Sequence, residues 1–134
     1  MTVIVCVDRN NGMMFHDRRQ SSDRTVIQNI MDYMGDKTLW IHPYSASLFE
    51  NVAGNICKDE RFWEKVGATD YCFVENCHIN DKNINKIILY RWDKKYPADV
   101  SLDVNLDKYI LKETLEFKGY SHDKITREVY EKYE

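Results

Sequence analysis

The segment RRQSSDR, residues 18–24, gathers three arginines with serine, glutamine and aspartate side chains. A guanidinium group can bind a carboxylate or a phosphate through two parallel hydrogen bonds. If a helix begins near Ser22, the free N–H groups and the dipole at its N-terminus would add to an anion site. The residues expected to line that site are Arg18, Arg19, Gln20, Ser21, Ser22 and Arg24.

The same segment also has a structural interpretation. The arginines would then form ion pairs within the chain, with Asp8, Asp17 and Asp23 as partners. Ser22 or Asp23 would cap the helix. Exposed ion pairs are common and contribute little stability. The residue types therefore leave both ligand binding and intramolecular pairing open.

Asp8 directly follows the apolar segment TVIVCV, which predicts a buried strand. Ligands in open α/β sheets bind beyond the C-terminal ends of the strands, so Asp8 is a candidate catalytic residue. Asn10 and Asn11 stand beside it, before Gly12, and could face the same ligand. A tight Asn-Gly turn with a positive φ accounts for these residues more simply.

Glu75 directly follows another apolar segment, DYCFV. If the two strands are parallel, Glu75 and Asp8 reach the same edge of the sheet, where they could hold a divalent metal. Solvated strand ends are the simpler explanation, and we expect no metal. Tyr44 and Ser45, which follow a third predicted strand, could face the same site as ligand-binding residues.

Five segments of the chain are apolar and often β-branched, which predicts that they form strands. Their ranges are 2–7, 37–41, 70–74, 86–92 and 109–117. An amphipathic pattern predicts a helix over 22–34, ended by Gly35. Shorter helices are predicted over 43–52 and 59–67, and 121–134 fits a helix slightly better than an edge strand.

Strands and helices alternate in the first half, which predicts parallel strands joined by right-handed crossovers. The second half is rich in strands, which predicts that further strands pair antiparallel with one edge of the parallel sheet. We therefore expect an α/β fold, a three-layer sandwich with a mixed, mainly parallel central sheet. A length of 134 residues suggests that 1–134 is a single domain.

The composition narrows the classes of partner. The net charge is −3 and the pI is about 5.8, which argues against general nucleic-acid binding. No segment approaches the roughly 20 apolar residues that span a bilayer. The N-terminus lacks the basic and apolar regions of a signal peptide. We expect a cytoplasmic protein whose four cysteines are reduced.

The order VIVCVDRNNGM, polar loop, helix and strand KTLWI resembles the start of dihydrofolate reductase. IILYRWDKKYPADVSLDV resembles that family's late strand and the acidic, proline-bearing loop after it. The resemblance implies a dihydrofolate-reductase-like fold. It also implies that Asp23 matches the carboxylate near the start of the first helix, which protonates and anchors the pterin.

Two departures from that family predict that no cofactor binds. The Gly-Arg-x-Thr turn that holds the cofactor phosphates falls at HPYS, where His42 and Pro43 replace Gly-Arg. The family's diglycine falls near Glu75 and Asn76. A carboxylate there would repel a pyrophosphate, and side chains would block close approach of the backbone.

NNGMMF-x-x-RRQS-x-D-R and GYSHDKIT resemble a family of short, uncharacterised proteins of Firmicutes. Some members of that family are labelled ribonuclease Z. That enzyme needs a His-x-His-x-Asp-His cluster to hold two metal ions. His16, His42, His78 and His122 stand apart in this sequence, so the residues do not support the label.

Three hypotheses about function stay open. The first is a module that binds a small anion, a nucleotide or a phosphorylated metabolite, without a dinucleotide site. The second is an enzyme, either a diverged reductase using Asp23 or a metal-dependent phosphoesterase using Asp8 and Glu75. The third is a module that docks its arginine loop on an acidic protein. The sequence contains no serine or cysteine nucleophile motif, which favours the first.

Overall fold

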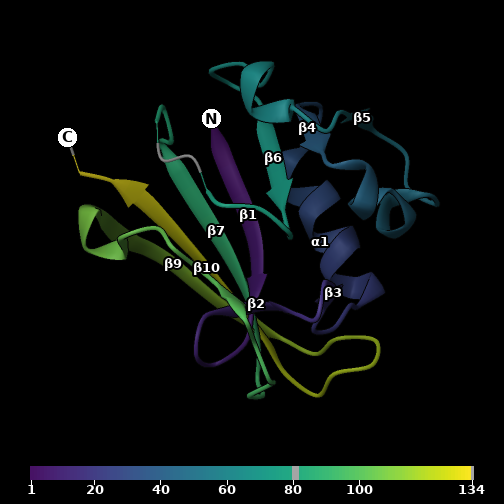
Figure 1. Ribbon diagram of the computed structural model, residues 1–134, viewed down its shortest axis with the longest axis vertical. Coiled ribbons are helices and arrows are strands. Elements are labelled where there is room, and N and C mark those ends of the chain that lie inside the picture. The colour runs from purple at the N-terminus through teal and green to yellow at the C-terminus, as the bar shows by residue number, and fades with distance from the viewer. Residues whose placement is uncertain (80–81, 134) are drawn as a thin grey trace.

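The computed structural model describes residues 1–79 and 82–133. Its main feature is a seven-stranded sheet in the order β5-β4-β6-β1-β7-β10-β9 (Figure 1). The strands are β1 (Thr2–Val7), β4 (Thr38–Ile41), β5 (Asn55–Lys58), β6 (Tyr71–Val74), β7 (Lys86–Trp92), β9 (Tyr109–Phe117) and β10 (Ile125–Lys132). Neighbouring strands from β5 to β7 are parallel, and β10 and β9 add antiparallel.

The three most apolar segments form the centre of this sheet, as predicted. Ile4 of β1 lies in register with Phe73 of β6 on one side and with Ile88 of β7 on the other. All three side chains are almost fully buried. The strands are apolar on both faces because both faces of the sheet are covered.

One face is covered by α1 (Arg24–Met34) and the 3-10 helix η1 (Pro43–Phe49). Asp23 caps α1 by accepting a hydrogen bond from the backbone of Thr25 at 2.8 Å. Gly35 ends the helix with φ of +60°, a conformation that favours glycine. The buried stripe of α1 is the predicted one: Val26, Ile27, Ile30, Met31 and Met34.

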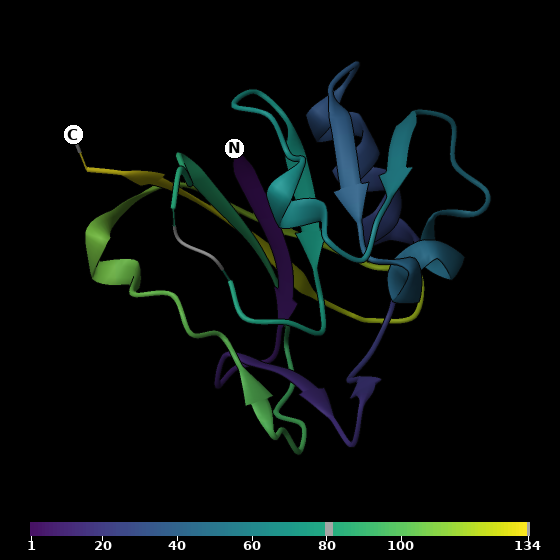
Figure 2. The same cartoon turned by 45° about the horizontal axis from the view of Figure 1, so that its top comes forward.

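The opposite face packs against a small sheet and short turns. Val3, Val5 and Val7 alternate with Ile4 and belong to a second buried cluster on this side. Figure 2 shows the small sheet beyond the C-terminal end of β1. These elements are β2 (Gly12–Phe15), β3 (Arg18–Arg19), β8 (Val100–Ser101), η2 (Phe62–Glu64) and η3 (Leu106–Lys108). The predicted α/β fold with a mixed, mainly parallel sheet is therefore confirmed.

The helices predicted over 43–52 and 59–67 are shorter than expected. The first is the 3-10 helix η1, and the second is reduced to the three residues of η2. Phe62 is still buried, as its predicted inward position requires. A single 3-10 turn suffices to bury that ring, so the apolar spacing did not require a longer helix.

The prediction of a helix over 121–134 is wrong; Glu134 lies outside the described residues. β10 is a strand, and it lies inside the sheet between β7 and β9. Ile125 and Val129 are both buried, and a spacing of four residues fits one face of a helix or of a strand. Pairing with strands on both sides satisfies the backbone and decides between them. No helix among the described residues is long and apolar enough to cross a membrane.

Candidate functional site

Most of the predicted site residues gather beyond the C-terminal ends of β1 and β6 and at the N-terminus of α1 (Figure 1). Asp8 and Glu75 directly follow these two strands, as predicted. Asp23 caps α1, and Arg19 lies in the short strand β3. The loop between β9 and β10, residues 118–124, reaches the same end of the sheet and contacts Asp23.

Asp8 is fully buried and holds four hydrogen-bond donors. Its Oδ1 accepts from the backbone N–H groups of Asn10 and Gly12, both at 2.8 Å. Its Oδ2 accepts from the backbone of Tyr96 at 3.0 Å and from Gln20 Nε2 at 3.1 Å. Burial opposes the charge, but these hydrogen bonds outweigh burial and lower the pKa of Asp8. The charged side chain of Asp8 therefore links three loops through hydrogen bonds.

The asparagines after Asp8 form the predicted turn. Asn11 has φ of +63°, and its side chain accepts a hydrogen bond from Arg91 Nη1 at 2.7 Å. Arg91 also pairs with Glu128 at 2.8 Å, which ties the turn to β10. Asn10 is exposed, and its backbone N–H is bound to Asp8.

Arg19 pairs with Glu75 rather than with an aspartate of its own segment. Arg19 Nε lies 2.8 Å from Glu75 Oε2, and Arg19 Nη2 lies 3.0 Å from Glu75 Oε1. Ser45 Oγ donates to the same carboxylate at 2.7 Å. Tyr44 accepts at its hydroxyl from the backbone N–H of Arg19 and lies under the guanidinium. This bidentate pair closes the space between β3, η1 and the end of β6.

The two carboxylates considered for a metal, Asp8 and Glu75, are thus both engaged by protein donors. Among residues 1–79 and 82–133, no group of three or more histidine, cysteine or acidic side chains is arranged to hold a metal ion. All four carboxylate oxygens of Asp8 and Glu75 accept hydrogen bonds from side chains or backbone N–H groups of the protein.

Asp23 holds the β9–β10 loop against the start of α1. Besides Thr25, its oxygens accept from the backbone N–H groups of Tyr120 and Ser121, both at 2.9 Å. Burial alone would raise the pKa of this carboxyl, but the hydrogen bonds outweigh it and hold the pKa far below its usual value. A Cβ on Gly119 would lie 2.5 Å from Asp23 Oδ2, so this close approach of the loop requires glycine.

The imidazole of His122 lies between Asp23 and Ser21 and contacts both. Its Nδ1 lies 2.8 Å from Asp23 Oδ2, and its Nε2 lies 2.7 Å from Ser21 Oγ. The imidazole stacks on the indole of Trp92, with ring centroids 4.6 Å apart. The side chain of His122 is only 8% exposed, so the ring is fixed on both edges and on one face. Asp23, His122 and Ser21 form an ordered line of carboxylate, imidazole and hydroxyl.

A groove of about 680 Å³ lies between α1 and η1. Arg24 and Thr25 stand at its α1 end, and the guanidinium carbon of Arg24 lies 3.9 Å from the ring centroid of Tyr120. Arg24 forms no ion pair with the part of the chain that the structure describes. Neither does Arg18, which is exposed on β3. The other residues lining the groove are Ile27, Gln28, Leu48, Asn51 and Val52.

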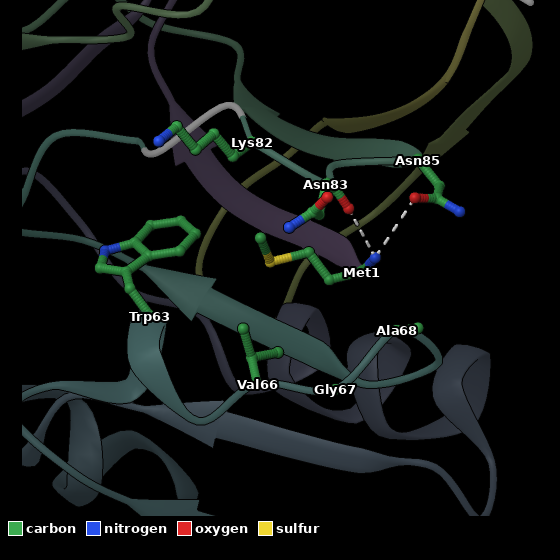
Figure 3. Close-up of a pocket in the computed structure, with 8 residues that line it drawn as sticks. All are labelled: Met1, Trp63, Val66, Gly67, Ala68, Lys82, Asn83 and Asn85. Atoms are coloured by element: carbon green, nitrogen blue, oxygen red, sulfur yellow. Dashed lines mark hydrogen bonds between the residues drawn. The ribbon is translucent and has the colours of Figure 1, made fainter.

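A second cavity, of about 450 Å³, lies at the opposite end of β1 (Figure 3). The amino-terminal ammonium of Met1 lies there and donates to the carbonyl of Asn83 at 2.9 Å and to Asn85 Oδ1 at 3.4 Å. Trp63 and Lys82 line it as well. None of the predicted site residues borders this cavity.

The structure adds residues to the site that the sequence does not reveal. His122 lies 101 residues from Ser21, and no motif spacing connects them. Tyr120, whose ring makes the cation–π contact with Arg24, is 67% exposed. From the sequence it would be classed as a surface aromatic residue. The resemblance of GYSHDKIT to the Firmicutes proteins is the only sequence feature that singles out this loop.

Comparison with solved structures identifies the fold. Dihydrofolate reductase from Enterococcus faecalis, complexed with NADP(H) and RAB-propyl, superposes with a TM-score of 0.68. The match covers 99% of this chain and 96% of the reductase, at 7% sequence identity. The chain thus has a dihydrofolate-reductase-like fold, as the resemblance of its N-terminal half implied. Identity this low shows the fold alone.

Comparisons of sequence add no relative. No model of a known protein family matches the chain, and neither does a curated protein. The resemblance to the Firmicutes proteins stays a prediction.

Proposed function

We propose that the protein binds a small anionic ligand in the groove between α1 and η1, and that it has no dinucleotide site. The observation that carries the proposal is the placement of the Arg24 guanidinium at the edge of a groove of about 680 Å³. Pockets for small ligands usually measure about 300–1,000 Å³ and combine apolar walls with a few polar groups. The groove has both the size and the composition.

Arg24 is the cation that this site needs. Tyr120 orients its guanidinium through a cation–π contact at 3.9 Å, which leaves the positive charge and the donor edge unneutralised. Arg19 is less suitable, because two of its nitrogens already hold Glu75. Of the predicted arginines, Arg24 alone lines the groove.

The other walls indicate what the ligand would carry besides its charge. Ile27, Leu48 and Val52 offer apolar surface, and Gln28 and Asn51 offer amide groups. A ligand with a carboxylate or phosphate next to a flat or aliphatic body would match this arrangement. A nucleotide or a phosphorylated metabolite belongs to that class.

Anion binding should raise the melting temperature of the wild type and of an Arg18→Leu control, but not of Arg24→Leu. With adenosine monophosphate at a hundred times its dissociation constant, the native state gains about 2.7 kcal/mol, a shift of several degrees. Arg18 is exposed without an ion pair in the described structure, so its loss should matter little. Differential scanning fluorimetry with phosphate and the nucleotide measures the shift. Equal shifts in Arg24→Leu and the wild type would disprove the assignment.

The absence of a dinucleotide site is supported by the network around Glu75. This carboxylate is only 8% exposed, and Arg19 and Ser45 occupy its oxygens. A pyrophosphate approaching the end of β6 would meet this buried pair and would have to break it. His42, at the start of η1, uses Nδ1 to accept from the backbone of Tyr44, so it presents no arginine-like fork.

Titration with NADPH should therefore give no measurable heat up to millimolar concentrations. A micromolar dissociation constant corresponds to about −8 kcal/mol, which would require a phosphate cradle that these residues do not form. Isothermal titration calorimetry is the measurement, with a dihydrofolate reductase titrated in parallel as the positive control. A micromolar constant for this protein would refute the proposal.

The alternative functions have less support. A pterin would need a carboxylate oxygen of Asp23, and both oxygens are already covered by donors from α1 and the β9–β10 loop. A metal-dependent phosphoesterase would need Asp8 and Glu75, which hold protein donors instead. Docking on an acidic protein would rest on Arg18, and it becomes the better hypothesis if anions never stabilise the wild type.

A further inference from the structure

We infer that Ser21 is a nucleophile for acyl transfer from small carboxylic esters, with His122 as its general base and Asp23 as the residue that orients the base. The hydroxyl lies 2.7 Å from His122 Nε2, within reach of a proton transfer. The other imidazole nitrogen, Nδ1, lies 2.8 Å from Asp23 Oδ2. A nucleophile bonded to a base that is itself held by a third group is the recurring geometry of activated serines.

The environment of Asp23 suits an orienting carboxylate. It stays ionised, because its backbone and side-chain donors hold its pKa far below the usual range. An ionised carboxylate accepts from the Nδ1–H of His122 and thereby leaves Nε2 unprotonated toward Ser21. Trp92 stacks on the ring and prevents it from turning out of line.

The proton and the bonds balance in two steps. Ser21 Oγ attacks the ester carbonyl carbon while its proton passes to His122 Nε2, and the alcohol leaves with that proton, which produces an acyl-serine. Water then attacks the acyl carbon, gives its proton to His122, and the acid is released as Ser21 recovers its hydrogen. Neither step requires an oxidant, a metal or a cofactor.

Ser21 lies close to the groove between α1 and η1. Ser21 is half-buried and lines a small cavity of about 10 Å³, and Ile27 and Leu48 line both this cavity and the groove. Ser21 thus shares two apolar neighbours with the groove, and the cavity beside it is about the size of one water molecule. On the other side, His122 borders a shallow hollow of about 140 Å³.

A donor for the developing oxyanion stands next to the nucleophile. Ser22 directly follows Ser21, and its backbone N–H makes no hydrogen bond with any residue that the structure describes. In several serine enzymes the N–H after the nucleophile stabilises the tetrahedral oxygen. The expected size of the ester's acyl group rests on the proposed function, because the groove would receive the ester. The assignment of Ser21 as the nucleophile does not.

An alkyl fluorophosphonate tests the nucleophile directly, since it phosphonylates activated serines and releases fluoride. The full-length wild type should gain one adduct, seen by intact mass, and peptide mapping should place it on Ser21. Ser101→Ala, a change at an exposed serine of β8 outside the proposed site, should label at the wild-type rate. His122→Asn should label about 10²- to 10⁴-fold more slowly, the usual contribution of a general base.

Ser21→Ala should also lose turnover of 4-nitrophenyl acetate, while adenosine monophosphate should still raise its melting temperature, because Ser21 does not line the groove that holds Arg24. This separates failure of the nucleophile from failure of the anion site. No adduct on the wild type, an adduct at another residue, or an unchanged rate in folded His122→Asn would overturn the inference. The line from Asp23 to Ser21 would then be only a tie between α1 and the β9–β10 loop. Circular dichroism verifies that each variant is folded.

Discussion

Replacing Asp8 by alanine should lower the free energy of unfolding by about 3–5 kcal/mol, because buried donors that lose a charged acceptor each cost about 1–3 kcal/mol. Asp8 is fully buried, and four donors converge on it. Three of these are the backbone N–H groups of Asn10, Gly12 and Tyr96, which follow the ends of β1 and β7. Without the carboxylate these groups would be left unsatisfied or would draw water into the core.

Urea unfolding followed by tryptophan fluorescence measures this loss. Asp36→Ala is a matched control, since Asp36 is exposed and its side chain has no partner among the described residues. That variant should stay within about 0.5 kcal/mol of the wild type. A loss below 1 kcal/mol in Asp8→Ala would mean that the loops are solvated without it and that Asp8 is free for another role.

Asp23→Ala should be the second most damaging change, with a loss of about 3 kcal/mol at neutral pH. Removal of a helix N-cap costs about 0.5–2 kcal/mol, and the orphaned N–H groups of Tyr120 and Ser121 add to this. His122 Nδ1 would also lose its contact with Asp23, although Ser121 Oγ, 3.2 Å away, would remain beside it.

The loss should depend on pH in a definite direction. The pKa of Asp23 is lowered in the folded state, so its stabilisation is fully present above the unfolded pKa of about 3.9 and disappears as pH falls through the lower folded value. The difference between the wild type and Asp23→Ala should therefore shrink from pH 6 to pH 2.5. Asp8 has a lowered pKa too, but its contribution cancels when both proteins are compared at the same pH. A difference independent of pH would show that Asp23 is protonated or unpaired when folded.

The sequence by itself determined the elements whose formation depends on residues close together in the chain. The runs that became β1, β6 and β7 are apolar at every position that a sheet covered on both faces must bury. The end of α1 follows from its apolar stripe and from Gly35, whereas the sequence left the cap open between Ser22 and Asp23, and the helix begins at Arg24 rather than at Ser22. The positions of Asp8 and Glu75 at strand ends follow from the same runs. These features depend on neighbours within a few residues, which the sequence displays.

Only the tertiary structure decided which strand ends and loops meet. Arg19 had three aspartates nearby in sequence, yet it pairs with Glu75, 56 residues away, because β3 passes over the end of β6. The C-terminal segment had a spacing that fits either structure, and partners on both sides made it the interior strand β10. That strand carries the loop that brings His122 to Asp23 and Ser21. Hydrogen bonds and ion pairs are short-ranged, so their partners depend on the packed arrangement, which local patterns do not encode.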